Sequence, residues 1–299
     1  MNTNNTDRGF CIIGCGRVGI NLAVFLTQQG YGPAALASRT LSSAQNAAAV
    51  VPGGMVFENP VEAAKDRGVV FITTPDDRIG KVCDQVAEGG GFDEHCVVFH
   101  LSGVLSSDIL SSARQNGAAT GSIHPLQAFA PYESHAASPF EGINISIEGT
   151  ARARVLGQKL VTALNARPFT IPTDAKTLYH ASAVVASNYL VTLEHMALTL
   201  LGRAGLAPDQ AFDILEPLIQ GTLRNIASRG SVDALTGPVV RGDETVIARH
   251  LSEIDKKMPE FSALYRLLGQ HTLEIARKRS DFPKTAEPGL TGLFSKKGM

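Results

Sequence analysis

The spacing of hydrophobic and polar positions changes near the middle of this chain. Up to about residue 171, short apolar runs alternate with amphipathic stretches, a pattern that predicts strands alternating with helices. From residue 175 onward, apolar residues recur at three- and four-residue spacing, and no further strand pattern follows. The chain is therefore expected to form an α/β domain with a doubly wound, mostly parallel sheet, followed by an all-α domain.

The elements can be placed from the same pattern. We expect strands at 10–13, 33–37, 69–74, 96–100, 119–123, 143–148 and 167–171, and helices at 20–29, 78–87, 106–115, 152–164, 175–204, 208–229, 243–258 and 259–279. Segment 143–148 alternates, which predicts an outer strand with one solvated face. The helix at 175–204 is apolar on most faces, which predicts burial, and the tail after residue 279 is expected to be loosely held. The domains are expected at 1–172 and 173–299.

The first strand runs directly into a glycine-rich turn, Gly14-Cys15-Gly16-Arg17-Val18-Gly19, and a helix follows. Strand, glycine turn and helix in this order are the fingerprint of a Rossmann-type dinucleotide-binding unit. Gly14 permits the sharp turn, Gly16 lets the backbone approach a pyrophosphate, and Gly19 lets the helix pack on the strand. The helix would then present its free N–H groups to the phosphates.

The second strand ends at Ser38-Arg39-Thr40, nineteen residues after Gly19. Units that bind NAD carry an acidic residue near this point for the ribose hydroxyls, and no acid is present here. A carboxylate would repel a 2′-phosphate, whereas Arg39 can bind one through charge-assisted hydrogen bonds. These residues therefore predict NADP(H) as the cofactor; the alternative is a solvated loop arginine.

Polar or small residues also follow later strands, at the sheet edge where ligands bind in this architecture. Thr74 and Pro75 are expected to line the nicotinamide side. Ser102 and Gly103 follow His100, and are expected at the cofactor. His124 and Gln127 follow the next strand and are candidates for substrate binding.

The long helix after the predicted domain boundary carries a polar stripe. Lys176, His180 and Ser187 share one face, and Asn188 lies close to it. We expect this stripe to face the cofactor domain, with His180 as the first candidate for a proton donor and Lys176 as the second. Arg241, in a loop shaped by glycine and proline, is a candidate for an anionic group of the substrate.

Composition narrows the class of protein. The 299 residues are 44% hydrophobic and 18% charged, as in an ordinary globular protein, and a net charge of −1 favours neither nucleic acid nor an anionic membrane as a partner. The four cysteines do not form a metal-binding spacing and are expected to be reduced cytosolic thiols. Segment 1–8 lacks the apolar core of a signal peptide. We expect a cytoplasmic protein without a metal or a membrane span.

Several segments together resemble the Rossmann-like/DUF2520 proteins, which are often labelled NADP oxidoreductases. They are GCGRVG, SRT, HLSG, IHPLQAF, YHASAVVASNYL and LTGPVVRGD. That group is distantly similar to pyrroline-5-carboxylate reductase, ketopantoate reductase and β-hydroxyacid dehydrogenases. The resemblance implies a nucleotide domain, a helical domain and a homodimer formed through the helices. The wider superfamily often uses a lysine followed by an asparagine on the long helix, and Lys176 and Asn188 resemble that pair at a different spacing.

Together these features predict an NADP(H)-dependent oxidoreductase. It would reduce a carbonyl or imine group of a small, anionic metabolite in a cleft between the two domains, with His180, Lys176 and Asn188 as catalytic candidates and Ser187 among the substrate contacts. The alternative is a regulatory or scaffold protein that binds NADP(H) without turnover. A deazaflavin cofactor is a third option, raised only by labels in the resembling families.

Overall fold

The computed structural model describes residues 8–134 and 137–295, so most of the polar segment 1–8 lies outside it. The chain divides into two compact units, Met1–Ser187 and Asn188–Met299. The first unit extends past residue 172, where the sequence placed the domain boundary. Beyond that position, the side chain of Lys176 is hydrogen-bonded to Ser102 and Ser122 of the sheet domain.

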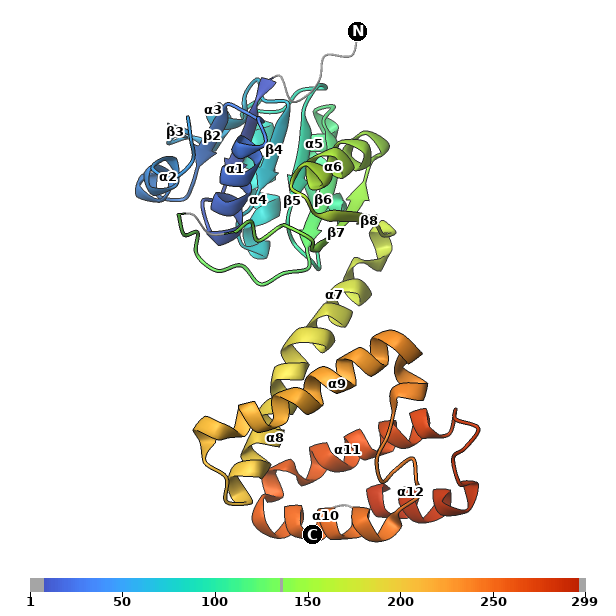
Figure 1. Cartoon of the computed structure of the whole chain (residues 1–299). Helices are drawn as coiled ribbons and strands as arrows, with labels where there is room; N and C mark the ends of the chain where they lie inside the picture. Colours follow the sequence, from blue (N-terminus) through green and yellow to red (C-terminus); the bar gives the residue numbers. More distant parts are fainter. Residues whose placement is uncertain (1–7, 135–136, 296–299) are drawn as a thin grey trace. The chain divides into compact units, whose positions relative to one another are not determined.

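An eight-stranded sheet, with strand order β3-β2-β1-β4-β5-β6-β7-β8, forms the centre of the first unit (Figure 1). Strands β1 to β6 are parallel, β7 is antiparallel to β6, and β8 is parallel to β7. This confirms the Rossmann-type, mostly parallel sheet. The strands are β1 (Phe10–Ile13), β2 (Ala34–Ala37), β3 (Met55–Phe57), β4 (Val69–Ile72), β5 (Val97–His100), β6 (Ala119–Pro125), β7 (Asn144–Gly149) and β8 (Arg167–Thr170).

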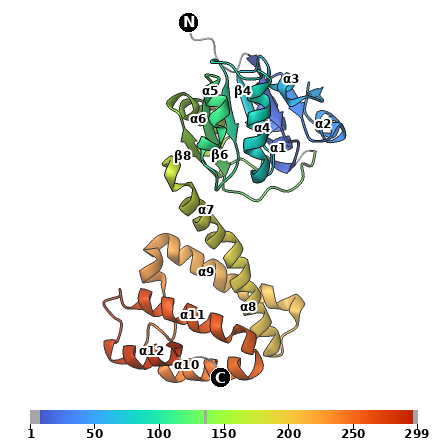
Figure 2. The ribbon, with the colours of Figure 1, turned by 180° about the vertical axis from the view of Figure 1, so that it is seen from behind.

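Helices cover both faces of this sheet, and each face has its own apolar core. One core joins alternate strand residues to α1 and α6, on the near side of the sheet in Figure 1. The other joins the remaining strand residues to α3, α4 and α5, and Figure 2 shows α4 and α5 from behind. The helices are α1 (Arg17–Gln28), α2 (Leu41–Ala48), α3 (Pro60–Ala64), α4 (Asp76–Glu88), the 3-10 helix Ser107–Leu110, α5 (Ser111–Gln115) and α6 (Ala151–Ala163).

The sequence pattern missed α2, β3 and α3, which are short, at eight, three and five residues. Polar caps begin both helices: Thr40 Oγ1 accepts from the N–H of Ser43 at 3.3 Å, and Asn59 Oδ1 from that of Val61 at 2.9 Å. Helix α4 begins without a side-chain cap among the described residues. Pro75 holds the cap position and Asp76 lies inside the first turn, where a carboxylate suits the helix dipole.

Strand β7 was predicted to have one solvated face, and this is wrong. Its polar residues Ser146 and Glu148 are each only 1% exposed. Because Ile145 and Ile147 contribute to the α1/α6 core, the polar residues between them point to the opposite face, towards the 3-10 helix Ser107–Leu110. Alternation here separates an apolar buried face from a polar buried face.

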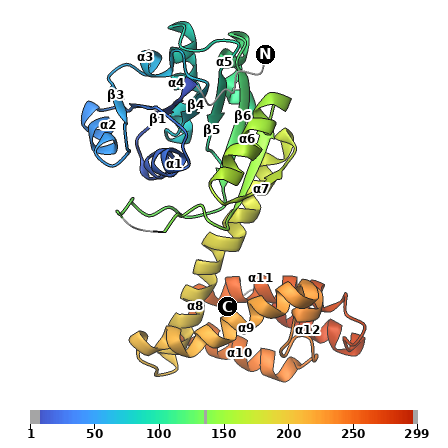
Figure 3. The ribbon, with the colours of Figure 1, turned by 45° about the horizontal axis from the view of Figure 1, so that its top comes forward.

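The second unit is helical, and its core lies among its last three helices (Figure 3). The tail after residue 279 was predicted to be loosely held; instead its described part, up to residue 295, ends in a helix with Leu290 and Phe294 at 0% and 2% exposure. A Cβ on Gly269 would lie 2.2 Å from the Phe294 ring, so the missing side chain makes room for it. The helices are α8 (Leu190–Arg203), α9 (Pro208–Ala234), α10 (Glu244–Lys257), α11 (Pro259–Ala276) and α12 (Glu287–Ser295).

The helix predicted at 175–204 forms as α7 (Lys176–Val184), a π-helical turn (Val185–Tyr189) and α8, but the predicted burial is wrong within this chain. Leu178 is 80% exposed and Val191 68%. Segment Thr173–Arg203 is long and apolar enough to cross a membrane by length and composition, with a mean hydropathy of 1.3. That value is only weakly apolar, so the segment is not a clear membrane span.

Candidate functional site

The glycine turn after β1 has the geometry that its sequence predicts. Gly14 has a φ of +116°, and a Cβ there would lie 2.7 Å from the carbonyl carbon of Thr73. A Cβ on Gly19 would lie 2.3 Å from the carbonyl oxygen of Gly14, so α1 packs against the turn only without a side chain. A Cβ on Gly16 would meet nothing within 4 Å. The backbone of Gly16 is therefore open to a ligand.

The start of α1 fits a pyrophosphate. Among the described residues, no side chain caps the helix and its first turn contains no acidic residue, so its N–H groups and dipole favour an anion. Arg17 is exposed beside Gly16 and Val18 is half-buried. At the end of β4, the buried hydroxyl of Thr74 has no hydrogen-bond partner among the described residues. A buried hydroxyl without a partner fits a site that takes a polar ligand.

The end of β2 leaves Arg39 available to a phosphate. Ser38 Oγ accepts from the N–H of Cys15 at 3.4 Å, which joins this segment to the glycine turn. Arg39 is exposed, and the described part of the chain offers it no ion pair. The hydroxyl of Thr40 caps α2 through Ser43, so it is already engaged by the protein.

Lys176 is a deeply buried charged group at this edge of the sheet. Its residue is 2% exposed, and its Nζ donates to the carbonyl oxygen of Ser102 and to Ser122 Oγ, each at 2.7 Å. Ser102 Oγ in turn donates to Asp76 at 2.8 Å. The ammonium group thus joins α7 to the ends of β5 and β6, with two of its three N–H groups engaged.

Two histidines lie near this ammonium group, and a third packs against one of them. His100 Nδ1 accepts from the N–H of Ser102 at 3.1 Å, and His124 Nδ1 lies 2.9 Å from the Tyr179 hydroxyl. The His124 and His180 rings meet edge to face, with their centroids 5.9 Å apart. A Cβ on Gly103 would lie 2.5 Å from His180 Nδ1 and 2.7 Å from His124 Nε2. The absent side chain of Gly103 therefore keeps a space to which both rings present a nitrogen.

Burial controls the protonation of these groups. It lowers the pKa of Lys176 to about 8, while the charges of Glu148 and Asp76 oppose that shift. Burial and then the Lys176 charge lower the pKa of His100 to about 3, and that of His124 to about 4. Both imidazoles are therefore neutral at pH 7. An ammonium group with a pKa near neutrality can donate a proton efficiently.

Four other predicted site residues are exposed within their own units. Ser187 is exposed at the end of the first unit, and Gln127 is exposed after β6. Asn188 and Arg241 are exposed in the second unit, so the polar stripe predicted on the long helix is buried only at Lys176. Within the described ranges, no group of three or more His, Cys, Asp or Glu residues is placed to hold a metal ion.

The sequence interpretation missed four residues of the cluster: Asp76, Ser122, Glu148 and Tyr179. Alternate polar residues in ATGSIHP and INISIE were a signal, since they place Ser122 and Glu148 on one face. That signal is ambiguous, because a solvated strand face has the same pattern. Asp76 and Tyr179 had no local signal that distinguishes them from a cap residue and a core residue.

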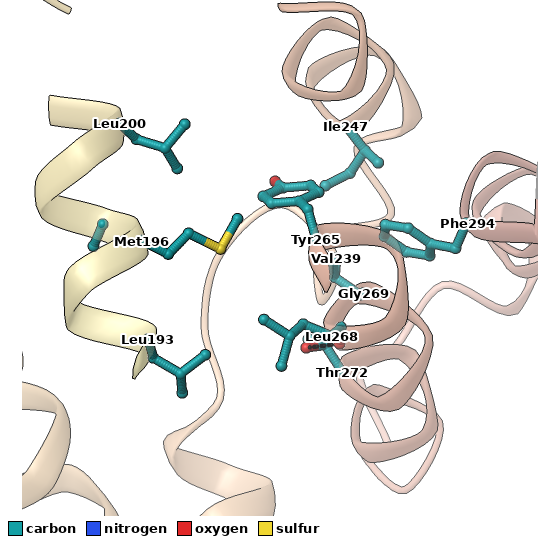
Figure 4. Close-up of a pocket in the computed structure, with 11 residues that line it drawn as sticks. Leu193, Met196, Leu200, Val239, Ile247, Tyr265, Leu268, Gly269, Thr272 and Phe294 are labelled. Atoms are coloured by element: carbon teal, nitrogen blue, oxygen red, sulfur yellow. Dashed lines mark hydrogen bonds between the residues drawn. The ribbon is translucent and has the colours of Figure 1, made fainter. Parts of the chain in front are cut away.

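An apolar pocket of about 270 Å³ lies in the second unit (Figure 4). Leu193, Met196 and Leu200 of α8 form one wall, and Tyr265 and Leu268 of α11 lie across from them. The Tyr265 hydroxyl forms a hydrogen bond with His250 Nδ1 at 2.8 Å. The described residues place no cluster of charged groups in this pocket, so it does not resemble a site for proton transfer.

Comparison with protein families assigns a domain to each half of the chain. Residues 4–125 match the model of a Rossmann-like domain, and residues 143–272 match a domain of unknown function, DUF2520. The family resemblance predicted from the sequence is thereby confirmed. No curated protein matches the chain.

Solved structures share this fold. A protein from Bacteroides fragilis, described as an inferred NADP oxidoreductase, is 24% identical, with a TM-score of 0.70 over 91% of this chain and 100% of that one. A protein from Thermotoga maritima is 26% identical, with a TM-score of 0.67 over 90% and 98%. Pyrroline carboxylate reductase from Plasmodium falciparum, with NADP bound, is 10% identical, with a TM-score of 0.55 over 97% and 99%. The similarity to pyrroline carboxylate reductase was also predicted.

The buried ammonium group predicts how stability depends on pH. The pKa of Lys176 is about 8 in the folded chain and near its ordinary value of 10.5 when unfolded. Between these values the unfolded chain binds more protons, so this residue's contribution to the free energy of unfolding rises with pH, by up to about 1.4 kcal/mol per pH unit. Urea unfolding of the wild type and Lys176→Met, from about pH 7 to 10.5, measures it. The free energy of unfolding of the wild type minus that of Lys176→Met should grow with pH. A difference that stays constant over this range contradicts the lowered pKa of Lys176.

Proposed function

For a chain that joins a Rossmann-like domain to a DUF2520 domain, we propose an NADP(H)-dependent reductase of a carbonyl or imine group in a small, anionic metabolite. The fold is that of oxidoreductases, among them one solved with NADP bound. The glycine turn and the start of α1 would hold the pyrophosphate. Ser38 and Arg39 would hold the 2′-phosphate, and Thr74 and Pro75 would lie beside the nicotinamide.

One observation carries the proposal. Along one edge of the sheet, hydrogen bonds and the short backbone segment 73–76 connect the glycine turn to the buried ammonium group. Thr73 Oγ1, at the end of β4, donates to the carbonyl oxygen of Gly14 at 2.6 Å. Three residues later, Asp76 accepts from Ser102, whose carbonyl oxygen accepts from Lys176. A cofactor lying across the turn would therefore extend towards the Lys176 cluster, as ligands do at the carboxyl ends of parallel strands.

NADPH, when bound, supplies a hydride to the substrate carbon. The oxygen or nitrogen of the reduced bond then needs a proton, and we assign Lys176 as the donor in place of His180, the sequence's first candidate. The reason is position: two hydrogen bonds orient Lys176, and its pKa of about 8 suits proton donation. His124 and His180 would orient the substrate from the space beside Gly103.

An anionic substrate suits the charge of this site. Lys176 is a buried cation, and neutral His124 is able to donate one further hydrogen bond. The similar reductase from P. falciparum acts on pyrroline carboxylate, a cyclic imine with a carboxylate group. Asn188 as a further catalytic residue and Arg241 as a partner of the anion stay predictions.

Arg39→Asp tests the choice of cofactor. The variant should weaken NADPH binding by roughly 1.5–3 kcal/mol, about 10- to 150-fold, because a hydrogen bond to a charged group is worth about that much. NADH binding should change far less. Calorimetric titration of both cofactors measures this, with Arg39→Lys as the control that keeps the charge. Equal loss of both cofactors, or no loss of NADPH, would remove Arg39 from the site.

Turnover separates the two candidate acids. We expect NADPH oxidation with a member of a panel of 2-oxo acids, aldehydes and cyclic imines that carry a carboxylate. Lys176→Met should then lower kcat by ~10²-fold or more, His180→Ala less than tenfold, and the exposed Lys159→Met not at all. If His180→Ala lowers kcat more than Lys176→Met does, His180 is the proton donor. NADPH binding without oxidation of any member favours the regulatory alternative.

We further propose that the protein is a homodimer formed through its helices. Within the described part of α9 only Ala211 is buried, while Phe212 and Leu218 are 50% and 68% exposed. Exposed apolar surface of this extent on α7, α8 and α9 marks an interaction site. A second copy offers a matching apolar face, since the two surfaces of a two-fold dimer are identical.

Sedimentation velocity tests the dimer. The wild type should sediment as a dimer, and Leu218→Glu should shift it to the monomer by burying a charge at the interface. Glu216→Lys, at an exposed position of the same helix, is the control and should stay dimeric. A wild type that remains monomeric at micromolar concentration would contradict the proposal.

A further inference from the structure

The sheet domain buries one carboxylate that the proposed reaction does not use. Glu148 of β7 is 1% exposed. Its Oε1 accepts from the N–H of Ser107 and its Oε2 from Ser107 Oγ, each at 2.8 Å. Carboxylates are almost never fully buried unless they are paired, because removing the charge from water is costly. Two bonds to one serine satisfy the oxygens but leave the charge without an opposite charge in direct contact.

The strand register places this carboxylate beside the lysine site. Glu148 lies directly opposite Ser122 in the antiparallel β6–β7 pair. Side chains opposite each other in such a pair point to the same face, with Cβ atoms about 4.5–5.5 Å apart. Ser122 Oγ accepts from Lys176 Nζ at 2.7 Å. The ammonium group and the carboxylate are thus neighbours of the same serine, although no ion pair joins them among the described residues.

Other titratable groups near Lys176 do not supply an equivalent charge. His100 of β5 and His124 of β6 are neutral at pH 7, and Tyr179 on its own helix is a phenol whose pKa burial raises. Asp76 of α4 is an anion but is exposed, so solvent screens it. Glu148 is the buried anion of the set. Its charge favours the protonated form of the lysine.

The same carboxylate also fixes a loop of the site. Residues 101–106 connect β5 to the 3-10 helix Ser107–Leu110, and Ser102 in this loop provides an acceptor for Lys176. His100 Nδ1 holds the near end through the N–H of Ser102. Glu148 holds the far end through both polar groups of Ser107. The loop is therefore tied on each side of the residue that the ammonium group contacts.

We propose that Glu148 is a positioning residue of this site: it is the buried counter-charge that keeps Lys176 protonated, and it fixes the loop that carries Ser102. Its part in turnover rests on the proposed function of Lys176. The charge interaction itself exists in the resting protein, without cofactor or substrate.

The direct test is the pKa of Lys176 in Glu148→Gln. Glutamine has nearly the same shape, and it is able to keep an acceptor for the Ser107 N–H and a donor for the Ser107 hydroxyl. Loss of the negative charge should disfavour the ammonium form and lower the pKa of Lys176 by about one pH unit, a tenfold change in proton affinity. NMR of protein labelled with [ε-13C]lysine follows this titration, with Lys176→Met to assign the signal.

Two controls separate the buried charge from a general charge effect. Asp76→Asn removes the exposed neighbouring anion and should shift the pKa of Lys176 less than Glu148→Gln does. Glu141→Gln, an exposed carboxylate in the segment before β7, should leave it unchanged. A Lys176 pKa in Glu148→Gln within about 0.3 units of the wild-type value would overturn the proposal.

A second measurement covers the case in which Glu148→Gln does not fold. Removing one of two compensating buried charges strands the other, so removing both should restore stability. Glu148→Gln/Lys176→Met should therefore fold where Glu148→Gln alone does not, and where both fold it should be the more stable in urea unfolding. A double variant that is no more stable overturns the pairing. Neither measurement uses NADPH, so a failure here leaves the reductase proposal standing, and failed turnover leaves this one standing.

Discussion

The account depends on one buried ammonium group. Lys176 lies where water cannot solvate it, and its charge is tolerated because a backbone carbonyl and a serine hydroxyl accept its protons. Those acceptors come from the ends of two different strands, so the single side chain connects α7 to the sheet. The same burial lowers the pKa of Lys176 towards neutrality. The burial of Lys176 therefore both connects α7 to the sheet and lowers the pKa of its ammonium group.

The polar groups around Lys176 are gathered by the sheet itself. On β5, β6 and β7, alternate residues point to one face, where they meet the 3-10 helix Ser107–Leu110. His100, Ser122 and Glu148 share that face, while the residues between them pack with α1 and α6. At β6 and β7 the second face of the sheet is polar but buried, so it holds a charged site without opening it to solvent. The glycine turn of β1 lies on the same edge of the sheet.

The sequence predicted what depends on neighbours along the chain. The glycine turn and the alternation of strands and helices that gives a mostly parallel sheet are local patterns, and the structure has them. It did not predict what depends on distant segments. The polar positions of β7 looked solvated, but Glu148 is buried and hydrogen-bonded to Ser107, 41 residues away. The tail containing Phe294 looked loose, and it is held by a space at Gly269.

The central claim is that NADPH binds across the glycine turn with its reactive ring at the Lys176 cluster. The most direct measurement is NMR of [ε-13C]lysine-labelled protein during titration with NADPH. The account predicts a saturable change in the Lys176 signal, while exposed lysines such as Lys159 keep theirs. A Lys176 signal that does not respond at saturating NADPH would contradict it.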